Sequence, residues 1–429
     1  MILYILFFLS ILFYSFFSYS LVDPNLVLSS NATYWSFQNW MWSTFFENGK
    51  LMAYTYFFLI TTLFIIYFNI LEKLRTNKTV IKNIFKNKYI FLFLIIILPL
   101  LFSYNALSHD VFNYIFNSRM IVEYGADPYV SVALDFPDDL WTRFMHNTHT
   151  PAPYGKGWTY LSLVPYLLGF GKFTLSLLSF RVWSLLSVFL LYFSLQHLSK
   201  SLLKRSLNLY ELGLVFFNPL LLIETISNYH NDLWMMVPAV FGVSFLVRSM
   251  GKKGSDNKDK MRLLIISIFL LIISISIKLA SLALIPIWLL AIGLDNISER
   301  FSQKLAVKFK LKSEMFKNIF EKFITSFWNK FQNYIPDFAA LLMLLPLFTA
   351  RSQQFLPWYV LWVFVWIPFI KIKLFRNLII IFTISSSLRY LPWLANNMDF
   401  SSQIITNQKY ITWLIPTVFL FTNLRKLKR

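Results

Sequence analysis

Long runs of apolar residues, separated by short polar connections, dominate the chain. Ile60 to Leu71, Tyr89 to Leu107 and Phe180 to Leu195 are nearly free of charge and long enough to span, or nearly span, the apolar core of a bilayer. No soluble domain of useful size fits between such runs. The pattern predicts an all-α, polytopic integral membrane protein in which residues 1–429 form a single transmembrane domain.

The connections between the apolar runs carry most of the Lys and Arg residues, and this bias predicts the orientation of the chain. The basic connections, which are expected in the cytoplasm, are 72–88, 252–262, 300–330, 371–376 and the tail 425–429. Alternation then places 23–50, 108–157, 227–231 and 392–409 outside, together with the turns around Lys278 and 351–356. About 12 spans with both termini inside are expected if the first helix is retained.

Three segments need separate interpretation. Residues 1–22 are apolar, and Ser18-Tyr19-Ser20 fits a signal-peptide cleavage site, but no basic region precedes the run, which favours a retained helix. Segment 158–171 is short for a full crossing, so a re-entrant or half-membrane helix is predicted. Segment 296–334 is basic, with Phe residues at amphipathic spacing, and is expected along the cytoplasmic leaflet.

Composition removes several kinds of chemistry. The chain has no Cys, which excludes disulfides, zinc–thiolate sites and thiol nucleophiles. Its 5 His residues are too scattered to indicate a metal cluster. The formal net charge of +20 follows the connections just described, so it indicates membrane orientation rather than nucleic-acid binding.

The connection 108–157 departs from the basic trend and is predicted to be a structured extracytoplasmic loop that carries the chemistry. Its acidic residues are Asp110, Glu123, Asp127, Asp135, Asp138 and Asp139, against Arg119, Arg143 and Lys156. Asp110 is expected at the water–lipid boundary, where partial desolvation raises the proton affinity of a carboxylate. The alternative is that Asp110 only caps a following helix, and the local spacing leaves both interpretations open.

Other polar residues are expected at the same outer level as this loop. They are the segment from Asn228 to Asp232, Lys278, Arg351 and Arg389. A single cation at a helix end more often reaches along the membrane to water than binds a ligand. Three cations at the depth of one acidic loop suggest instead an anionic group, such as a phosphate, at the outer boundary.

The order of these residues resembles that of the GT-C glycosyltransferases, and it is most similar to the polyprenol-phosphate-mannose-dependent mannosyltransferases. The resemblance rests on Asp110-Val111-Phe112-Asn113-Tyr114, Arg119, Asp127-Pro128-Tyr129, Tyr154-Gly155, His230-Asn231-Asp232, Lys278 and Pro357-Trp358-Tyr359. Two positions depart from the family pattern. The chain has Tyr154-Gly155-Lys156-Gly157-Trp158 in place of Tyr-Gly-Pro-Leu-Trp, and Ser118 where Gly is usual before the loop arginine, which leaves the sugar open.

The resemblance implies a membrane hexosyltransferase that moves a sugar, expected to be mannose, from a polyprenyl-phosphate donor to a glycan or lipid-linked acceptor on the outer face. Asp110 would be the general base of an inverting transfer, while Lys278 and Arg351 would stabilise the leaving phosphate. The other expected substrate-binding residues are Tyr114, Arg119, Asp127, Tyr129, Tyr154, His230, Asn231, Asp232, Trp358 and Tyr359. No cofactor and no metal ligand are assigned, although the acidic loop could bind a divalent metal.

A transporter or flippase of lipid-linked glycans is the main alternative, because it would share the many helices and the buried cations. Such proteins favour internal repeats with helices broken near the bilayer midplane. The sequence contains no convincing repeat, and its special polar residues gather at one face. Both observations favour the enzyme. A non-catalytic scaffold would have no reason to keep a carboxylate and cations at one depth.

Overall fold

The computed structural model describes residues 2–23, 29–75, 88–251, 257–293, 331–349 and 355–427. Within these ranges the regular elements are helices, and there is no strand. Helices are expected in a chain that enters lipid, because each backbone N–H and C=O there must be satisfied within the segment. The all-helical class predicted from the apolar runs is confirmed. Segment 296–334 lies largely outside the described residues.

Six described helices are long and apolar enough to cross a bilayer, and up to seven if one bent pair counts as a single span. They are α1 with η1 (Ile2–Leu21), α3 (Gly49–Arg75), α7 (Phe173–Leu202), most of α10 (Asp232–Gly251), α11 (Asn257–Ile277) and the pair α16–α17 (Lys373–Ala395). The bent pair joins α8 (Leu209–Phe216) to Pro219–Ser227 at 55°. Three shorter apolar helices cover Tyr89–Phe102, Leu279–Gly293 and Ile335–Phe348. The count of about 12 spans stays a prediction.

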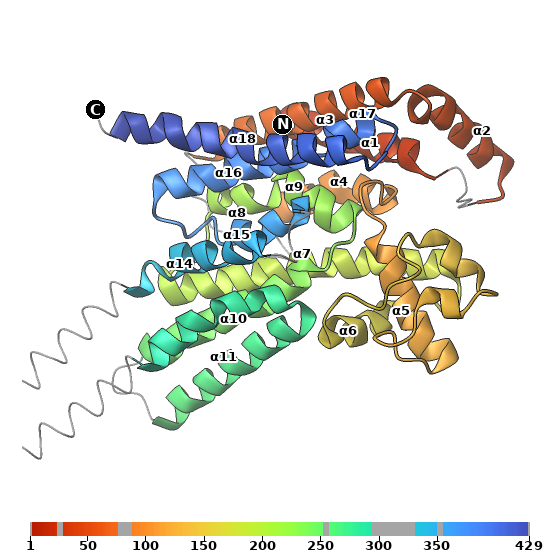
Figure 1. Cartoon of the computed structure of the whole chain (residues 1–429). Helices are drawn as coiled ribbons and strands as arrows, with labels where there is room; N and C mark the ends of the chain where they lie inside the picture. The colour runs from red at the N-terminus through yellow and green to blue at the C-terminus, as the bar shows by residue number, and fades with distance from the viewer. Residues whose placement is uncertain are drawn as a thin grey trace, which may run out of the picture.

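The helices predicted to face the same side lie at the same end of the molecule. α2 (Ala32–Met41), α5 (Asp110–Tyr124) and α6 (Lys156–Leu167) lie toward the right in Figure 1. The C-terminal end of α18 (Ser402–Leu427) and the first turn of α11 lie toward the left. The described helices beside the connections expected outside therefore lie opposite the start of α11 and the end of α18, which adjoin basic connections in the sequence.

Helix α10 forms the centre of the bundle, and it is mostly buried, whereas α11 beside it is mostly exposed. α10 packs against both α7 and α11, while α1 packs on α3 and α16 packs on α18. The bent pair after α8 carries η6, a short π-helix (Ile223–Ser227) that packs against α7 and η3 (Leu98–Phe102). This arrangement brings the start of α10 close to the start of α5.

The first part of the predicted outer loop is not a loop, because it forms the 15-residue helix α5. Val111, Phe112, Ile115 and Phe116 recur at helical spacing on it and are buried, which explains why this part folds as a helix. α5 ends at Gly125, whose left-handed backbone (φ 60°) suits glycine. Short 3₁₀ helices, η4 (Ala133–Asp135) and η5 (Leu140–Phe144), follow in an otherwise irregular segment.

The segment predicted as a re-entrant or half-membrane helix contains α6, which has 12 residues and is too short to cross a bilayer alone. α6 begins in close contact with the end of α11. A Cβ atom on Gly155 would lie 2.0 Å from the carbonyl oxygen of Ser276, and one on Gly157 would lie 2.1 Å from its hydroxyl. These two glycines, of which only Gly157 departs from the family pattern, let Tyr154 approach the region of Lys278.

Candidate active site

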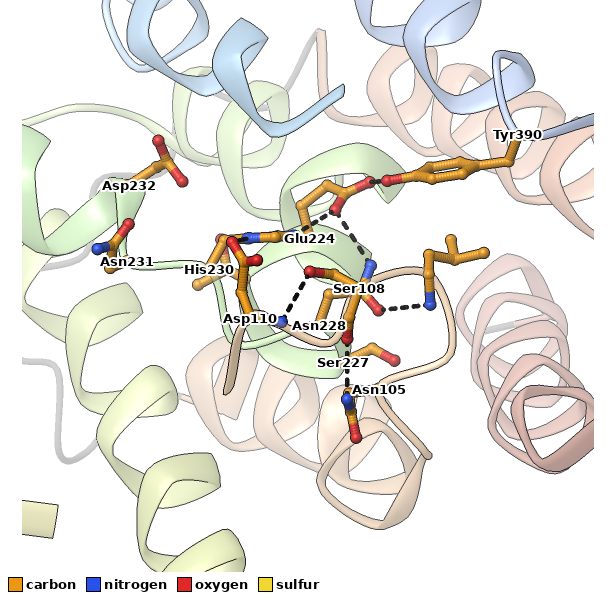
Figure 2. Close-up of polar contacts among 12 residues, drawn as sticks. Asn105, Ser108, Asp110, Glu224, Ser227, Asn228, His230, Asn231, Asp232 and Tyr390 are labelled. Atoms are coloured by element: carbon orange, nitrogen blue, oxygen red, sulfur yellow. Dashed lines mark hydrogen bonds and ion pairs between the residues drawn. The ribbon is translucent and has the colours of Figure 1, made fainter. Parts of the chain in front are cut away.

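Asp110 is positioned by the irregular segment that leads into α5. The amide of Leu107 donates to Oδ1 of Asn228 at 3.3 Å, and the amide of Asp110 donates to Oγ of Ser108 at 3.2 Å (Figure 2). His109 occupies the N-cap position of α5 and makes no side-chain capping bond, so Asp110 is the first residue of the helix. The carboxylate of Asp110 points to His230, and this is not the capping arrangement that the local spacing left open.

His230 lies between two carboxylates. Its Nδ1 atom is 3.5 Å from Oδ2 of Asp110, and its Nε2 atom is 3.4 Å from Oε2 of Glu224. The imidazole is fully buried and stacks on the ring of Trp358, with centroids 3.6 Å apart and planes inclined by 20°. The ring is therefore held on both edges and on one face.

The turn that carries His230 is fixed by a half-buried arginine, Arg181. Tyr229 has a left-handed backbone (φ 60°), which is uncommon for a residue with a side chain. Nε of Arg181 on α7 donates to the hydroxyl of Tyr229. The same guanidinium donates to the carbonyl of Leu101 at 2.8 Å and to that of Ser103 at 2.9 Å. Arg181 thus ties the turn before α10 to the segment before α5.

Electrostatics favour an ionised pair at Asp110 and His230. Burial alone would raise the pKa of Asp110, but the imidazole of His230, the ammonium of Lys278 and the hydroxyl of Tyr154 together lower it below its usual value. Burial opposes protonation of His230, yet the two facing carboxylates raise its pKa. Burial does raise the proton affinity of Asp110, as expected from the sequence, but the neighbouring groups outweigh burial, so the net pKa is lowered.

A second ion pair lies where α10, α11 and η10 (Pro357–Val360) meet. Nζ of Lys278 is 2.8 Å from Oδ1 of Asp232 and 3.2 Å from Oδ1 of Asn231. Nε1 of Trp362 donates to the same Asp232 oxygen. Tyr359 and Trp362 stack on each other with centroids 4.4 Å apart, and the ammonium of Lys278 lies over both rings. Lys278 is therefore a paired cation.

An aromatic group covers the other side of Asp110. The ring of Tyr114 makes edge contacts with Tyr154 at 4.9 Å and with Trp158 at 5.0 Å between centroids. Burial is the main cause of a raised pKa at Tyr154, and the charge of Asp110 adds to it. The aromatic rings thus lie directly beside the carboxylate on α5.

Several buried polar atoms around this centre have no hydrogen-bond partner within the described part of the chain. On the α5 and α6 side they are Oδ1 of Asn113, Oη of Tyr114 and Nε1 of Trp158. At the start of α10 they are Nδ2 of Asn231 and Oδ2 of Asp232. Buried polar groups are normally satisfied in a folded protein, so these atoms are suited to a polar ligand such as a sugar.

Three predicted substrate residues organise the outer segment. Nε of Arg119 is 2.5 Å from Oδ2 of Asp139. Oδ1 of Asp127 accepts from the amide of Tyr129 at 2.9 Å, and the hydroxyl of Tyr129 bonds that of Thr159 at 2.6 Å. These contacts connect the segment after α5 to α5 and α6, and their role toward substrate stays a prediction.

The sequence also predicted two other cations at the outer level, Arg351 and Arg389, and left open whether the acidic loop binds a metal. Arg351 lies outside the described residues. Arg389 is buried and donates to Oγ1 of Thr412 on α18 at 3.1 Å, so it connects two helices. Among the described residues, no three His, Asp or Glu side chains are grouped so that they could hold a metal ion.

Glu224 and Arg181 are the parts of this centre that the sequence analysis missed. Glu224 is a lone carboxylate in an apolar run, and Arg181 stands at the start of another. An ionisable residue in an apolar segment is a functional candidate by default, so both carried a usable signal. Their partners could not be read, because each reaches across from another helix.

Comparison with known families agrees with this geometry. Residues 24–293 match the family described as the alpha-(1->6)-mannopyranosyltransferase N-terminal domain, the MptA_B family. No curated protein and no solved structure gives a significant match. The matched part is nearly two thirds of the chain and contains Asp110, Glu224, His230, Asp232 and Lys278. The resemblance to mannosyltransferases inferred from the sequence is confirmed, and the chain belongs to the alpha-(1->6)-mannopyranosyltransferase family.

Proposed function

We propose that the protein transfers a mannosyl group from a polyprenyl-phosphate donor to a hydroxyl of a glycan or lipid-linked acceptor, forming an α-(1→6) linkage. The observation that carries the proposal is the Asp110–His230 pair inside a region that matches the mannosyltransferase family. The site contains a carboxylate next to an imidazole whose pKa is raised, and a separate carboxylate–ammonium pair. It also contains buried polar atoms that lack a hydrogen-bond partner among the described residues. This is the set of groups that an inverting glycosyl transfer needs.

Asp110 is the general base. The acceptor oxygen attacks the anomeric carbon of the donor as its proton passes to the carboxylate of Asp110. The bond between that carbon and the phosphate oxygen breaks on the opposite face, and its electron pair leaves with the phosphate. Displacement without a covalent intermediate inverts the anomeric carbon. An α-linked product therefore requires a β-linked donor.

Lys278 stabilises the charge that grows on the leaving phosphate. Its side chain is only 18% exposed, so it acts where water screens charges weakly. Without a bound donor, Asp232 and Asn231 hold this ammonium at the N-terminal end of α10. On donor binding, the phosphate oxygens share the ammonium with Asp232. Arg351 is proposed as a second phosphate ligand from its sequence position alone.

The sugar lies between the aromatic residues of α5 and α6 and the turn before α10. Aromatic faces suit the apolar face of a sugar ring, while the unpartnered atoms of Asn113, Tyr114 and Trp158 suit its hydroxyls. Trp358 and Tyr359, both on η10, form the remaining side of the proposed sugar site. Both come from beyond residue 293, outside the family match.

The proposed reaction occurs at the outer membrane boundary. The helices around Asp110 lie at the end of the molecule opposite the C-terminal end of α18, which leads into a basic tail (Figure 1). Basic connections favour the cytoplasm, so the catalytic end faces outward. A lipid-anchored donor reaches this depth without leaving the bilayer.

The test is to incubate the purified protein with radiolabelled β-mannosyl polyprenyl phosphate and candidate glycan acceptors. Sugar transfer by the wild type and its loss in Asp110→Asn are the expected results. General-base catalysis typically contributes about 10²–10⁴-fold, so a variant that keeps more than about a tenth of the wild-type rate would exclude Asp110 as the base. Movement of the labelled donor between leaflets without product would support a flippase instead.

A further inference from the structure

Glu224 is a buried carboxylate to which the transfer reaction described above assigns no role. Its side chain is 1% exposed, and it lies on η6, inside the bundle. Oε2 of Glu224 faces Nε2 of His230 at 3.4 Å, on the edge of the ring opposite Asp110. An uncompensated buried charge is strongly destabilising, so this position requires an explanation.

Glu224 is held in place from several helices. The hydroxyl of Tyr390 donates to its Oε1 at 3.0 Å, and Nδ2 of Asn228 donates to its Oε2 at 3.1 Å (Figure 2). Tyr14 on α1 and Tyr56 on α3 also interact electrostatically with its carboxylate. The amide of His230 donates to the main-chain carbonyl of Glu224 at 3.1 Å, so the two residues share one turn.

We propose that Glu224 is a positioning residue of the transfer reaction, which holds the ring of His230 and its positive charge against Asp110. The inference rests on the proposed function, since it assigns to Glu224 an effect on the base of that reaction. Glu224 touches neither donor nor acceptor, and it takes no proton in the step.

The geometry favours a positively charged ring. Both nitrogens of His230 face carboxylate oxygens, at 3.5 Å and 3.4 Å, and only the imidazolium carries a proton on each nitrogen. Trp358 covers one face of the ring. On the Asp110 side, the groups that feel the same carboxylate are Lys278, Tyr114 and Tyr154. Without Glu224, Asp110 alone would have to offset the burial of the imidazolium.

The consequence reaches the reacting carboxylate through His230. An imidazolium beside Asp110 keeps it an anion, ready to receive the acceptor proton. If Glu224 loses its charge, His230 gives up its proton at lower pH, and Asp110 holds a proton to higher pH. Both changes narrow the pH range in which an anionic Asp110 faces a cationic His230.

The first experiment needs no substrate. The chain has 5 His residues, so selective ¹⁵N-histidine labelling gives a simple NMR spectrum, and the His230→Gln variant identifies the signal of His230. In Glu224→Gln the titration midpoint of His230 should fall by about 1–3 pH units, as expected for the loss of one close opposite charge. In Glu224→Asp, which keeps the charge but withdraws it, the fall should be smaller. Unchanged midpoints in both variants would overturn the proposal.

The second experiment measures turnover against pH with the mannosyl donor. In Glu224→Gln the acid limb of the pH–activity profile should shift to higher pH, and the alkaline limb should shift to lower pH. The pH range of activity should therefore become narrower. A uniform loss with an unchanged profile would mean that Glu224 is only structural. The matched control is Glu211→Gln, which breaks a 2.6 Å ion pair with Arg205 at the start of α8 and should keep the wild-type profile.

The two proposals fail separately. If Asp110→Asn keeps full activity while the His230 midpoint moves in Glu224→Gln, the proposed base is wrong, and only the effect of Glu224 on the charge of His230 stands. If Asp110→Asn is inactive and neither the midpoint nor the profile responds to Glu224, the positioning role alone is wrong.

Discussion

The ammonium of Lys278 lies 2.8 Å from the carboxylate of Asp232, and it rests over the rings of Tyr359 and Trp362 at 5.5 Å and 5.6 Å. The pair joins the end of α11 to the start of α10. The same cation therefore has a structural role in the resting protein and a proposed role toward phosphate.

The two roles of Lys278 can be separated by single and paired substitutions. Lys278→Met leaves the Asp232 carboxylate buried without its cation, and removing one partner of a buried pair costs about 3–5 kcal/mol. Thermal unfolding should therefore occur at a lower temperature. Adding Asp232→Asn should recover most of that loss, since no unpaired carboxylate remains.

Donor use should not recover in the paired variant. A charge-assisted bond to the leaving phosphate is worth about 1.5–3 kcal/mol, or roughly 10- to 150-fold in rate. Turnover per folded molecule, measured against donor concentration, checks this. Recovery of both stability and donor kinetics would show that Lys278 only holds Asp232.

We expect the buried imidazole of His109 to make the folded protein less stable in acid. Its ring stacks on His146 with centroids 3.7 Å apart, and burial, with help from His146, lowers the pKa of His109 to about 3. The unfolded chain binds a proton at the ordinary pKa of about 6.5, so between these values acid favours unfolding. The free energy of unfolding should fall by up to about 1.4 kcal/mol per pH unit from this group.

The measurement is thermal unfolding in detergent from pH 7 to pH 4. His109→Phe, which stacks but does not titrate, should reduce the acid sensitivity. His149→Phe is the control, because His149 is exposed. Equal pH dependence in wild type and His109→Phe would remove His109 as the cause.

Orientation in the membrane can be tested because the chain has no Cys. Val130→Cys lies in the outer segment and is 77% exposed, while Asn257→Cys lies at the exposed start of α11. An impermeant thiol reagent added to intact cells should label the first and spare the second. Labelling of Asn257→Cys alone would invert the topology and place the catalytic end inside.

Arg119 is predicted to stabilise the outer segment more than it binds substrate. Its ion pair with Asp139 has only 1% exposure on the carboxylate side, and Trp141 stacks under the guanidinium at 4.3 Å. Arg119→Gln should therefore increase protease cleavage within 126–150 and lower the unfolding temperature. A variant that folds like the wild type but needs more acceptor would instead make Arg119 a substrate ligand.

The sequence located much of the centre because ionisable residues are costly near lipid. Asp110, His230, Asp232 and Lys278 each end an apolar run, and a membrane fold brings such ends to one level. The helical part of 108–157 was also readable, since Val111, Phe112, Ile115 and Phe116 follow helical spacing. The expectation of a loop gave weight to prolines and glycines that come later in the segment.

Pairings between helices could not be predicted. The contact of Glu224 with His230 depends on the left-handed backbone at Tyr229, which Arg181 stabilises from α7. The partner of Arg119, 20 residues away, depends on how η5 folds back on α5. Such contacts require the three-dimensional path of the chain, which residue spacing does not contain.

The position of the last partners along the chain bears on biosynthesis. Glu224 and Asp232 leave the ribosome well before Trp362 and Tyr390, which bond to them in the finished protein. Until those residues arrive, the nascent bundle holds carboxylates whose burial in lipid costs about 2.5–3.5 kcal/mol each. Chains truncated before Trp362 should therefore be less stable in the membrane than the full chain, because both carboxylates then lack a partner that the finished fold supplies.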